Sequence, residues 1–149
     1  MRLLESRDHC QLSNLLDDYN GECLFEDLGL YCDRTVAATN LLANDRIFTL
    51  AAFDQDHSIK GAMACFVDHP WYSLDVLSIM LFWYVRPGHR NGLGRLILEG
   101  AMTVSKNMGA SHFSFGKCYA HIKNDRNAMD RLAERMGFAV CGVEYMRTL

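Results

Sequence analysis

Apolar and polar positions follow a helical period in two segments of the first third of the chain. The segment from Met1 to Glu5 predicts a short strand. From Asp8 onward, leucines and a tyrosine recur at helical spacing, which predicts an amphipathic helix with Ser6 or Asp8 as its N-cap. The segment from Asp33 to Asn44 predicts a second helix, capped by Asp33. We therefore expect a short strand and two helices before the main sheet.

The middle of the chain has the pattern of β-strands. The segments Arg46 to Phe53 and Ile59 to Val67 flank a short polar connection that is typical of a hairpin. A third strand follows from Val76 to Val85, and its nearly continuous apolar character indicates a central strand covered on both faces. Pro87 ends this strand because proline has no N–H group to donate to a sheet.

The last third of the chain alternates between the two patterns. One apolar stripe from Leu93 to Met108 predicts a helix that ends at Gly109. A strand is then expected from His112 to Tyr119, a helix from Asn127 to Met136, and a last strand from Phe138 to Met146. The order β, α, α, β, β, β, α, β, α, β predicts a mixed α+β fold, which we expect to form one domain over residues 1–149.

Composition limits the classes of partner. Half of the 149 residues are hydrophobic and 22% are charged, which is ordinary for a folded domain. The formal net charge of -3 provides no general attraction to nucleic acid or to an anionic membrane, so we expect neither as a partner. Any phosphate-binding site must therefore depend on a few neighbouring groups rather than on the net charge of the protein.

Cysteine spacing and the N-terminal sequence bear on metals and location. None of the six cysteines forms a CxxC pair, and the single CxxH pair of Cys118 and His121 cannot complete a four-ligand zinc site, so we expect no metal. Charges interrupt the apolar runs near the N-terminus, which predicts neither a signal peptide nor a membrane span. These features together favour a cytoplasmic protein with free thiols.

The segment from Val85 to Gly100 has the order of a strand, a short basic turn with glycines, and a helix. A helix N-terminus has unsatisfied N–H groups and a partial positive charge, so it stabilises an anion. Taken alone, glycines before a helix usually reflect turn geometry, and Arg90 and Arg95 would be solvated surface charges. The order of the three features makes this turn the candidate phosphate site.

This segment resembles the acetyl-CoA-binding motif of the GCN5-related N-acetyltransferases. That motif is a strand ending in V-x-P and then Q/R-x-x-G-x-G/A; this chain has Val85-Arg86-Pro87 and then His89-Arg90-Asn91-Gly92-Leu93-Gly94. A second segment, from Asn124 to Phe138, is similar to the family helix N-x-x-A-x-x-L-Y-x-K-x-G-F, with Ala133 in place of its tyrosine. The resemblance covers nearly the whole chain and implies that family's fold, a mainly antiparallel sheet flanked by helices.

The resemblance implies an acetyl-CoA-dependent N-acetyltransferase that transfers an acetyl group to a primary amine directly, in a ternary complex. The pyrophosphate would lie on the backbone N–H groups of residues 91–95, and the backbone of residues 84–86 would pair with the pantetheine arm. The N–H group of Val85 would stabilise the thioester oxyanion. The residues expected to bind acetyl-CoA are Tyr84, Val85, Arg86, His89, Arg90, Asn91, Gly92, Leu93, Gly94, Arg95, Asn124 and Asn127.

Acetyl transfer needs a neutral amine, so a general base must remove a proton, directly or through water. The candidates for the base, among which no spacing decides, are Glu26, Asp75, His121 and Glu144. His121 and Tyr119 follow the strand that would face the cleft, so we assign them as base and acid, with Tyr145 as the reserve acid. The acceptor amine can belong to a small molecule or to a protein.

A second hypothesis is a catalytically impaired domain of the same fold that acts as a CoA-binding or protein-interaction module. It rests on His89, where the family prefers glutamine or arginine, on the short turn, and on Ala133. Members of the family often dimerise through the C-terminal strand, so the resemblance also implies a homodimer.

Overall fold

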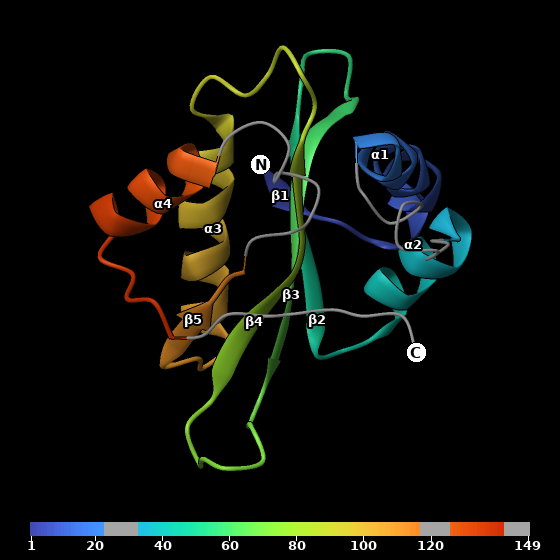
Figure 1. Ribbon diagram of the computed structural model, residues 1–149. Helices are drawn as coiled ribbons and strands as arrows, with labels where there is room; N and C mark the ends of the chain where they lie inside the picture. The colour runs from blue at the N-terminus through green and yellow to red at the C-terminus, as the bar shows by residue number, and fades with distance from the viewer. Residues whose placement is uncertain (23–32, 117–125, 142–149) are drawn as a thin grey trace, which may run out of the picture.

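The computed structural model describes residues 1–22, 33–116 and 126–141 (Figure 1). Its five strands form one sheet in the order β1-β2-β3-β4-β5. The strands are β1 (Arg2–Leu3), β2 (Ile47–Phe53), β3 (Ile59–Asp68), β4 (Leu77–Val85) and β5 (His112–Ser114). All neighbouring pairs are antiparallel except β4 and β5, which are parallel. The prediction of a mixed, mainly antiparallel sheet is confirmed.

Helices cover both faces of this sheet. On one face lie α1 (His9–Glu22) and α2 (Arg34–Ala43), and on the other lie α3 (Leu93–Asn107) and α4 (Arg126–Arg135) (Figure 1). Successive side chains of a strand point to opposite faces, so β4 sends Phe82 and Tyr84 into the core under α1, and Trp83 and Val85 into the core under α3. The second half of β4 is therefore buried on both faces. Ile79 and Leu81 in its first half are exposed, so the prediction of burial along the whole strand is confirmed only for the second half.

The start of α1 differs from the prediction. A 3₁₀ turn, η1 (Ser6–Asp8), precedes the helix, which begins at His9. The Asp8 carboxylate accepts from the Glu5 N–H group at 2.9 Å and forms an ion pair with Arg2 at 2.6 Å, so it holds the turn and β1 together. The prediction of Ser6 or Asp8 as the N-cap of α1 is therefore wrong. For α2 the prediction is confirmed, because Asp33 accepts from the N–H groups that open the helix.

The two last predicted strands also differ. Strand β5 ends at Ser114, whereas the prediction ran to Tyr119, and the residues after Gly116 lie outside the described ranges. The Phe138 N–H group donates to the carbonyl of Ala133, and the Phe138 ring packs on Phe115 with the centroids 4.6 Å apart. Residues 138–141 therefore close α4 and form no strand, and the rest of that prediction lies outside the described ranges.

A bulge in β4 shapes the part of the sheet nearest α3. Ala64 of β3 lies opposite Phe82, but Cys65 lies opposite Met80, so Leu81 is an extra residue in β4. The parallel pairing of β4 with β5 ends just before it, at Ile79 and Ser114. A bulge bends its strand and increases the local twist. Beyond Ile79, no described strand pairs with the β5-side edge of β4.

Candidate functional site

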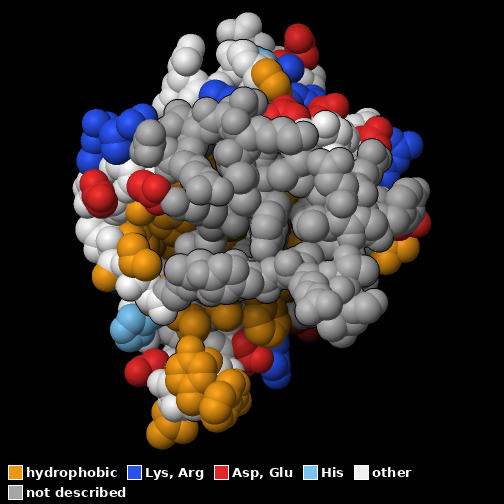
Figure 2. Space-filling view, viewed as in Figure 1, with side chains coloured by type: hydrophobic (Ala, Val, Ile, Leu, Met, Phe, Trp, Pro, Cys, Tyr) orange, Lys and Arg blue, Asp and Glu red, His pale blue; other side chains and the backbone are white. Residues whose placement is uncertain are grey.

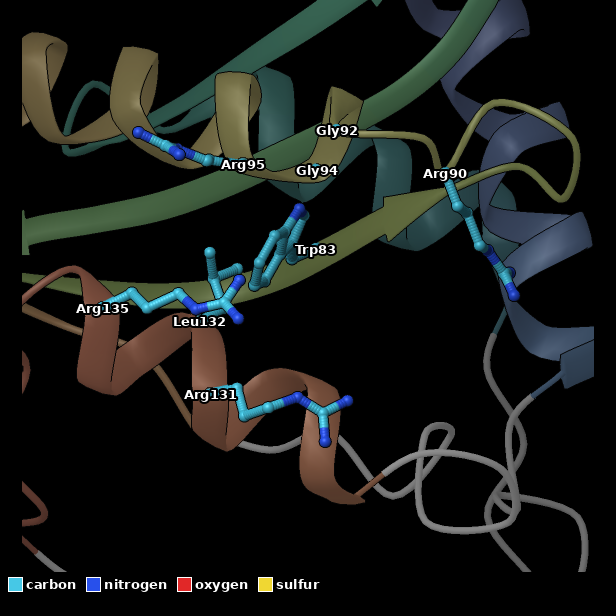
Figure 3. A pocket seen from close by; sticks show the side chains of 8 residues that line it. All are labelled: Trp83, Arg90, Gly92, Gly94, Arg95, Arg131, Leu132 and Arg135. Atoms are coloured by element: carbon cyan, nitrogen blue, oxygen red, sulfur yellow. The ribbon is translucent and has the colours of Figure 1, made fainter.

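A cavity of about 330 Å³ lies between the start of α3 and α4 (Figure 3). Its lining residues come from β4, the turn before α3, α3 itself and α4. They are Trp83, Arg90, Gly92, Gly94, Arg95, Arg131, Leu132 and Arg135. Four of these eight residues are arginines, and none is a carboxylate. Walls of this composition favour an anionic ligand, because one guanidinium group can donate two parallel hydrogen bonds to the oxygens of a phosphate or carboxylate.

The first turn of α3 presents backbone donors to this space. Gly92 is the N-cap, with a φ of 83° that costs glycine little and strains other residues. Its carbonyl accepts from the Leu96 N–H group at 3.2 Å, so the N–H groups of residues 93–95 precede the first intrahelical bond. A Cβ atom on Gly92 would meet nothing within 4 Å. As far as the described residues show, the helix therefore begins at open space, with its N–H groups accessible to a ligand.

Gly94 lies directly against Trp83 of β4. A Cβ atom on Gly94 would lie 3.3 Å from Cζ2 of Trp83, so glycine lets α3 rest on the indole ring. Trp83 is only 8% exposed, and its Nε1 atom has no hydrogen-bond partner among the described residues. Figure 3 shows this nitrogen directed toward the start of α3. A buried N–H group without an acceptor is rare, and this one lies at the cavity wall.

Two arginines of the turn are held by α1. Arg90 donates from Nε to the Val85 carbonyl at 2.8 Å and pairs through Nη2 with Glu22 at 2.5 Å. The sequence placed its side chain on the pyrophosphate, but in the structure it borders the cavity and points away from α4 (Figure 3). Arg86 pairs with Asp18 at 2.6 Å. Both contacts fix the end of β4 against α1.

On the β5 side of β4, no described strand pairs with the backbone groups that lie beside the cavity. The Arg86 N–H group donates to the Lys60 carbonyl of β3 at 2.9 Å. Because consecutive residues of a strand direct their N–H groups to opposite edges, the Val85 N–H group faces the edge that β5 leaves open. An extended ligand with amide groups can add to such an edge as a strand does.

The wall formed by α4 was missed in the sequence analysis. Arg131 and Arg135 are four residues apart, so they lie on the same side of the helix, with Leu132 beside them. The signal was present as two arginines at helical spacing, but only the packing of α4 against α3 brings them to the glycine turn. His89 and Asn91 lie in the exposed turn and do not line the cavity.

The predicted acid and base residues are not brought to the cavity by the described part of the structure. Tyr119, His121, Tyr145, Glu26, Glu144 and Asn124 lie outside the described ranges. Asn127 lies in the first turn of α4. Asp75 lies in the β3–β4 loop, where its carboxylate accepts from the Ser73 hydroxyl at 3.3 Å. This loop precedes β4, whereas the cavity lies beyond its other end, so Asp75 is separated from it by the length of the strand.

The aromatic side chains of the β3–β4 loop and of β4 divide into two groups. Phe82 and Trp83 are buried, whereas Trp71 is 95% exposed at the tip of the β3–β4 loop. Tyr72 and Leu74 are exposed beside it, and hydrophobic side chains gather in this part of the surface (Figure 2). Trp71 and Tyr72 therefore lie far from the cavity. Of these aromatic residues only Trp83 lines it.

The described residues provide no clear metal site or membrane helix. Within residues 1–22, 33–116 and 126–141, no group of three or more histidine, cysteine or acidic side chains is placed to hold a metal ion. None of the described helices combines the length and the apolar character needed to cross a bilayer.

No family model matches the sequence, and no curated protein matches it. Solved structures match it over almost its whole length. A ribosomal-protein-alanine N-acetyltransferase from Brucella melitensis biovar Abortus 2308 is 16% identical, with a TM-score of 0.73 over 99% of this chain and 97% of that chain. A GNAT family acetyltransferase from Staphylococcus aureus is 17% identical, with a TM-score of 0.69 over 99% of this chain and 96% of that chain.

A third match was solved with a ligand that contains CoA. The protein AAC(6')-Iy, in complex with the bisubstrate analogue CoA-S-monomethyl-acetylneamine, is 12% identical. Its TM-score is 0.71 over 99% of this chain and 97% of that chain. Similarity at these identities reports on architecture. The chain has the fold of the GCN5-related N-acetyltransferases, as its two motifs predicted.

Proposed function

We propose that this protein is an acetyl-CoA-dependent N-acetyltransferase that transfers the acetyl group to a primary amine directly, in a ternary complex. The observation that carries the proposal is the cavity at the start of α3. It combines arginine side chains, an open helix N-terminus and the Trp83 N–H group, which has no acceptor among the described residues, and it adjoins an edge of β4 that no described strand covers. Similar folds in structures described as acetyltransferases support the same reading.

Each part of acetyl-CoA has a counterpart in this arrangement. The pyrophosphate would rest on the first-turn N–H groups of α3, where the dipole favours negative charge. The pantetheine amides would pair with the open edge of β4, which would deliver the thioester to the opening between β4 and β5. The Val85 N–H group, which faces that opening, would stabilise the oxyanion as the amine attacks.

The proton transfers are assigned to residues that follow β5. His121 would accept the proton of the incoming amine, and Tyr119 would protonate the departing thiolate, with Tyr145 as the alternative acid. A small-molecule amine and a protein amine both remain candidate acceptors. One similar structure is a ribosomal-protein-alanine acetyltransferase, and another holds a CoA analogue joined to acetylneamine. We place the reaction in the cytoplasm and expect a homodimer.

The cofactor site can be tested with two variants of one residue. Gly92→Asp and Gly92→Asn introduce side chains of nearly equal shape at the same left-handed backbone, so both bear the same strain. An aspartate at a helix N-terminus does not oppose folding. It does repel a pyrophosphate bound there. Titration calorimetry with acetyl-CoA should therefore show an affinity for the Asp variant lower than that of the Asn variant by roughly tenfold or more.

Two results would contradict the cofactor site. Wild-type protein that does not bind acetyl-CoA would remove the basis of the proposal. Equal affinities of the Asp and Asn variants, measured while both unfold with similar free energies, would place the pyrophosphate away from α3.

The second candidate function is a CoA-binding or protein-interaction module without activity. Ala133, half-buried in α4, favours it because the family helix has a tyrosine at this position. The release of free thiol from acetyl-CoA, followed over a panel of small amines and peptides with free N-termini or lysines, distinguishes the two functions. Binding without thiol release on any member of the panel would favour the module.

A further inference from the structure

The loop between β3 and β4 carries three exposed hydrophobic side chains. Trp71 and Leu74 are each 95% exposed, and Tyr72 is 69% exposed. The loop extends beyond the helices at one end of the sheet (Figure 1), where hydrophobic side chains gather on the surface (Figure 2). Single exposed hydrophobic residues are ordinary, but three within residues 71–74 form a contiguous patch. Such patches often mark interaction sites.

Hydrogen bonds within the loop support its shape. The Ser73 N–H group donates to the Pro70 carbonyl at 3.1 Å, and the Asp75 N–H group donates to the Ser73 hydroxyl oxygen at 3.0 Å. The rings of Trp71 and Tyr72 pack edge to face, with their centroids 5.4 Å apart. The patch is therefore preformed, so a partner that binds it orders few additional side chains.

The charges beside the patch suit a second copy of the same loop. At the β3 end of the loop, Arg46 pairs with Asp68, and at the β4 end lies Asp75. The Arg46 side chain is 64% exposed, and a guanidinium group has five donors, so the pair with Asp68 leaves some of them available. In a two-fold dimer, a contact from residue i to residue j is matched by a contact from j to i. An axis through the patch can therefore bring Arg46 of each copy to Asp75 of the other.

The area of the patch indicates a weak contact. A buried aromatic side chain contributes about 150–250 Å², so Trp71, Tyr72 and Leu74 together offer about 400–500 Å² per copy. Two copies would bury about 800–1,000 Å² in total, which is less than the roughly 1,200 Å² of stable complexes. Residues 69–76 contain no lysine or arginine, so the loop lacks the cations that attract a protein to an anionic membrane.

We propose that the β3–β4 loop is a self-association surface, on which Trp71, Tyr72 and Leu74 of two copies pack together in a weak two-fold dimer. The family resemblance implies a dimer through the C-terminal strand, whereas the exposed loop places the contact on a different segment. The proposal is independent of the proposed function, because the length of β4 separates the loop from the cofactor cavity.

The oligomeric state tests the proposal. In sedimentation velocity, the sedimentation coefficient of the wild-type protein should rise from the monomer value at about 5 µM toward the dimer value at about 500 µM. The double variant Trp71→Ser and Leu74→Ser should remain monomeric throughout this range, with an unchanged midpoint of urea unfolding. Val36→Ser, the matched control, removes an exposed hydrophobic side chain from α2 and should dimerise as the wild type does.

Tryptophan fluorescence tests whether the contact involves Trp71. The chain has two tryptophans and Trp83 is buried, so quenching by acrylamide reports mainly on Trp71. Quenching should decrease as the concentration of wild-type protein rises, and Leu74→Ser should reduce this dependence. A dimer that forms without protecting Trp71 would overturn the proposal.

Three other results would also overturn the self-association surface. They are a wild-type protein that stays monomeric at about 500 µM, a dimer that persists in the double variant, and a dimer that Val140→Ser abolishes while the double variant keeps it. Monomeric wild-type protein that binds phosphatidylcholine vesicles through these side chains would assign the loop to a lipid surface instead. The double variant should bind acetyl-CoA as the wild type does, so the dimer and the cofactor site can fail separately.

Discussion

The hydroxyl of Tyr84 donates to the carboxylate of Glu22 at 2.6 Å, which joins the central strand β4 to the last turn of α1. The same carboxylate pairs with Arg90, which also binds the Val85 carbonyl. Burial, and next the hydrogen bond to Glu22, raise the pKa of Tyr84 above its ordinary range, so the phenol remains a donor. One acidic side chain therefore ties the strand end and the turn before α3 to a helix on the opposite face of the sheet.

Removal of this hydroxyl should weaken the fold. In Tyr84→Phe the ring stays packed against Tyr19, while the half-buried Glu22 carboxylate loses a donor. We expect the free energy of unfolding in urea to fall by about 1–2 kcal/mol. The control Tyr72→Phe removes a hydroxyl from an exposed tyrosine, and it should change the free energy of unfolding by less than about 0.5 kcal/mol. Equal losses in the two variants would show that the contact with Glu22 contributes nothing.

A second prediction concerns acid stability. The hydrogen bond from Arg2 lowers the pKa of the buried Asp8 carboxyl to about 2. A group whose pKa is lower in the folded protein stabilises the fold above its unfolded pKa, about 3.9, and this contribution is lost as the pH falls toward 2. We expect Asp8→Asn to lower the free energy of unfolding at pH 6 by roughly 1–2 kcal/mol, which allows for the partial exposure of Arg2.

The pH profile provides the control for this prediction. Between about pH 4 and pH 2 the wild-type protein should lose more stability than Asp8→Asn, and the two unfolding curves should converge. Some loss will persist in the variant, because the hydrogen bond from Lys60 lowers the pKa of Asp54 to about 2 as well. Asp56→Asn, in the exposed β2–β3 connection, should follow the wild-type profile. Parallel profiles for wild type and Asp8→Asn would contradict the assignment.

The elements that the sequence predicts well are those whose pattern matches burial on the sheet. The continuous apolar run through Phe82, Trp83, Tyr84 and Val85 predicts burial on both faces, which these residues have, and Asp33 caps α2 as expected. The position of the turn before α3 was predictable because any strand, turn and helix in this order ends in open backbone N–H groups at the helix N-terminus.

The failures have a common physical origin in contacts between distant segments. Asp8 does not cap α1, because its carboxylate pairs with Arg2 of β1. Phe138 does not begin a strand as predicted. Its ring packs on Phe115 at the end of α4. The wall of the cavity that α4 forms was missed because it depends on how α4 packs. No local period in the sequence records such contacts.

A third prediction concerns thiol reactivity. Cys65 is fully buried, and burial raises its pKa to about 12, despite a hydrogen bond with Ser78 that acts in the opposite direction. The thiolate is the reactive form, and at pH 8 only roughly one Cys65 in ten thousand would be ionised. Iodoacetamide should therefore modify the exposed Cys10 and leave Cys65 intact until urea unfolds the protein, as read by mass spectrometry of the two peptides. Modification of both at equal rates would contradict the burial of Cys65.

The last prediction connects the sheet to the cofactor cavity. Gly61 of β3 lies opposite Val85, and a Cβ atom there would come within 2.9 Å of Val85 Cγ2 and 3.0 Å of both Ile97 Cδ1 and the Tyr84 carbonyl oxygen. Since the carbonyl is backbone, the end of β4 must move to accept a methyl group. We expect Gly61→Ala to lower the free energy of unfolding by about 1–3 kcal/mol. It should also weaken acetyl-CoA binding, because the Val85 N–H group and the turn before α3 shift together.

A matched glycine separates the clash from a general effect of the substitution. Gly21 lies near the end of α1, and a Cβ atom on it would meet nothing within 4 Å. Gly21→Ala should therefore raise the free energy of unfolding by about 0.5 kcal/mol and leave the affinity for acetyl-CoA unchanged. If Gly61→Ala lowers stability but retains full affinity, the position of the β4 backbone at Val85 does not govern cofactor binding. The pyrophosphate turn would then carry the affinity without help from the strand.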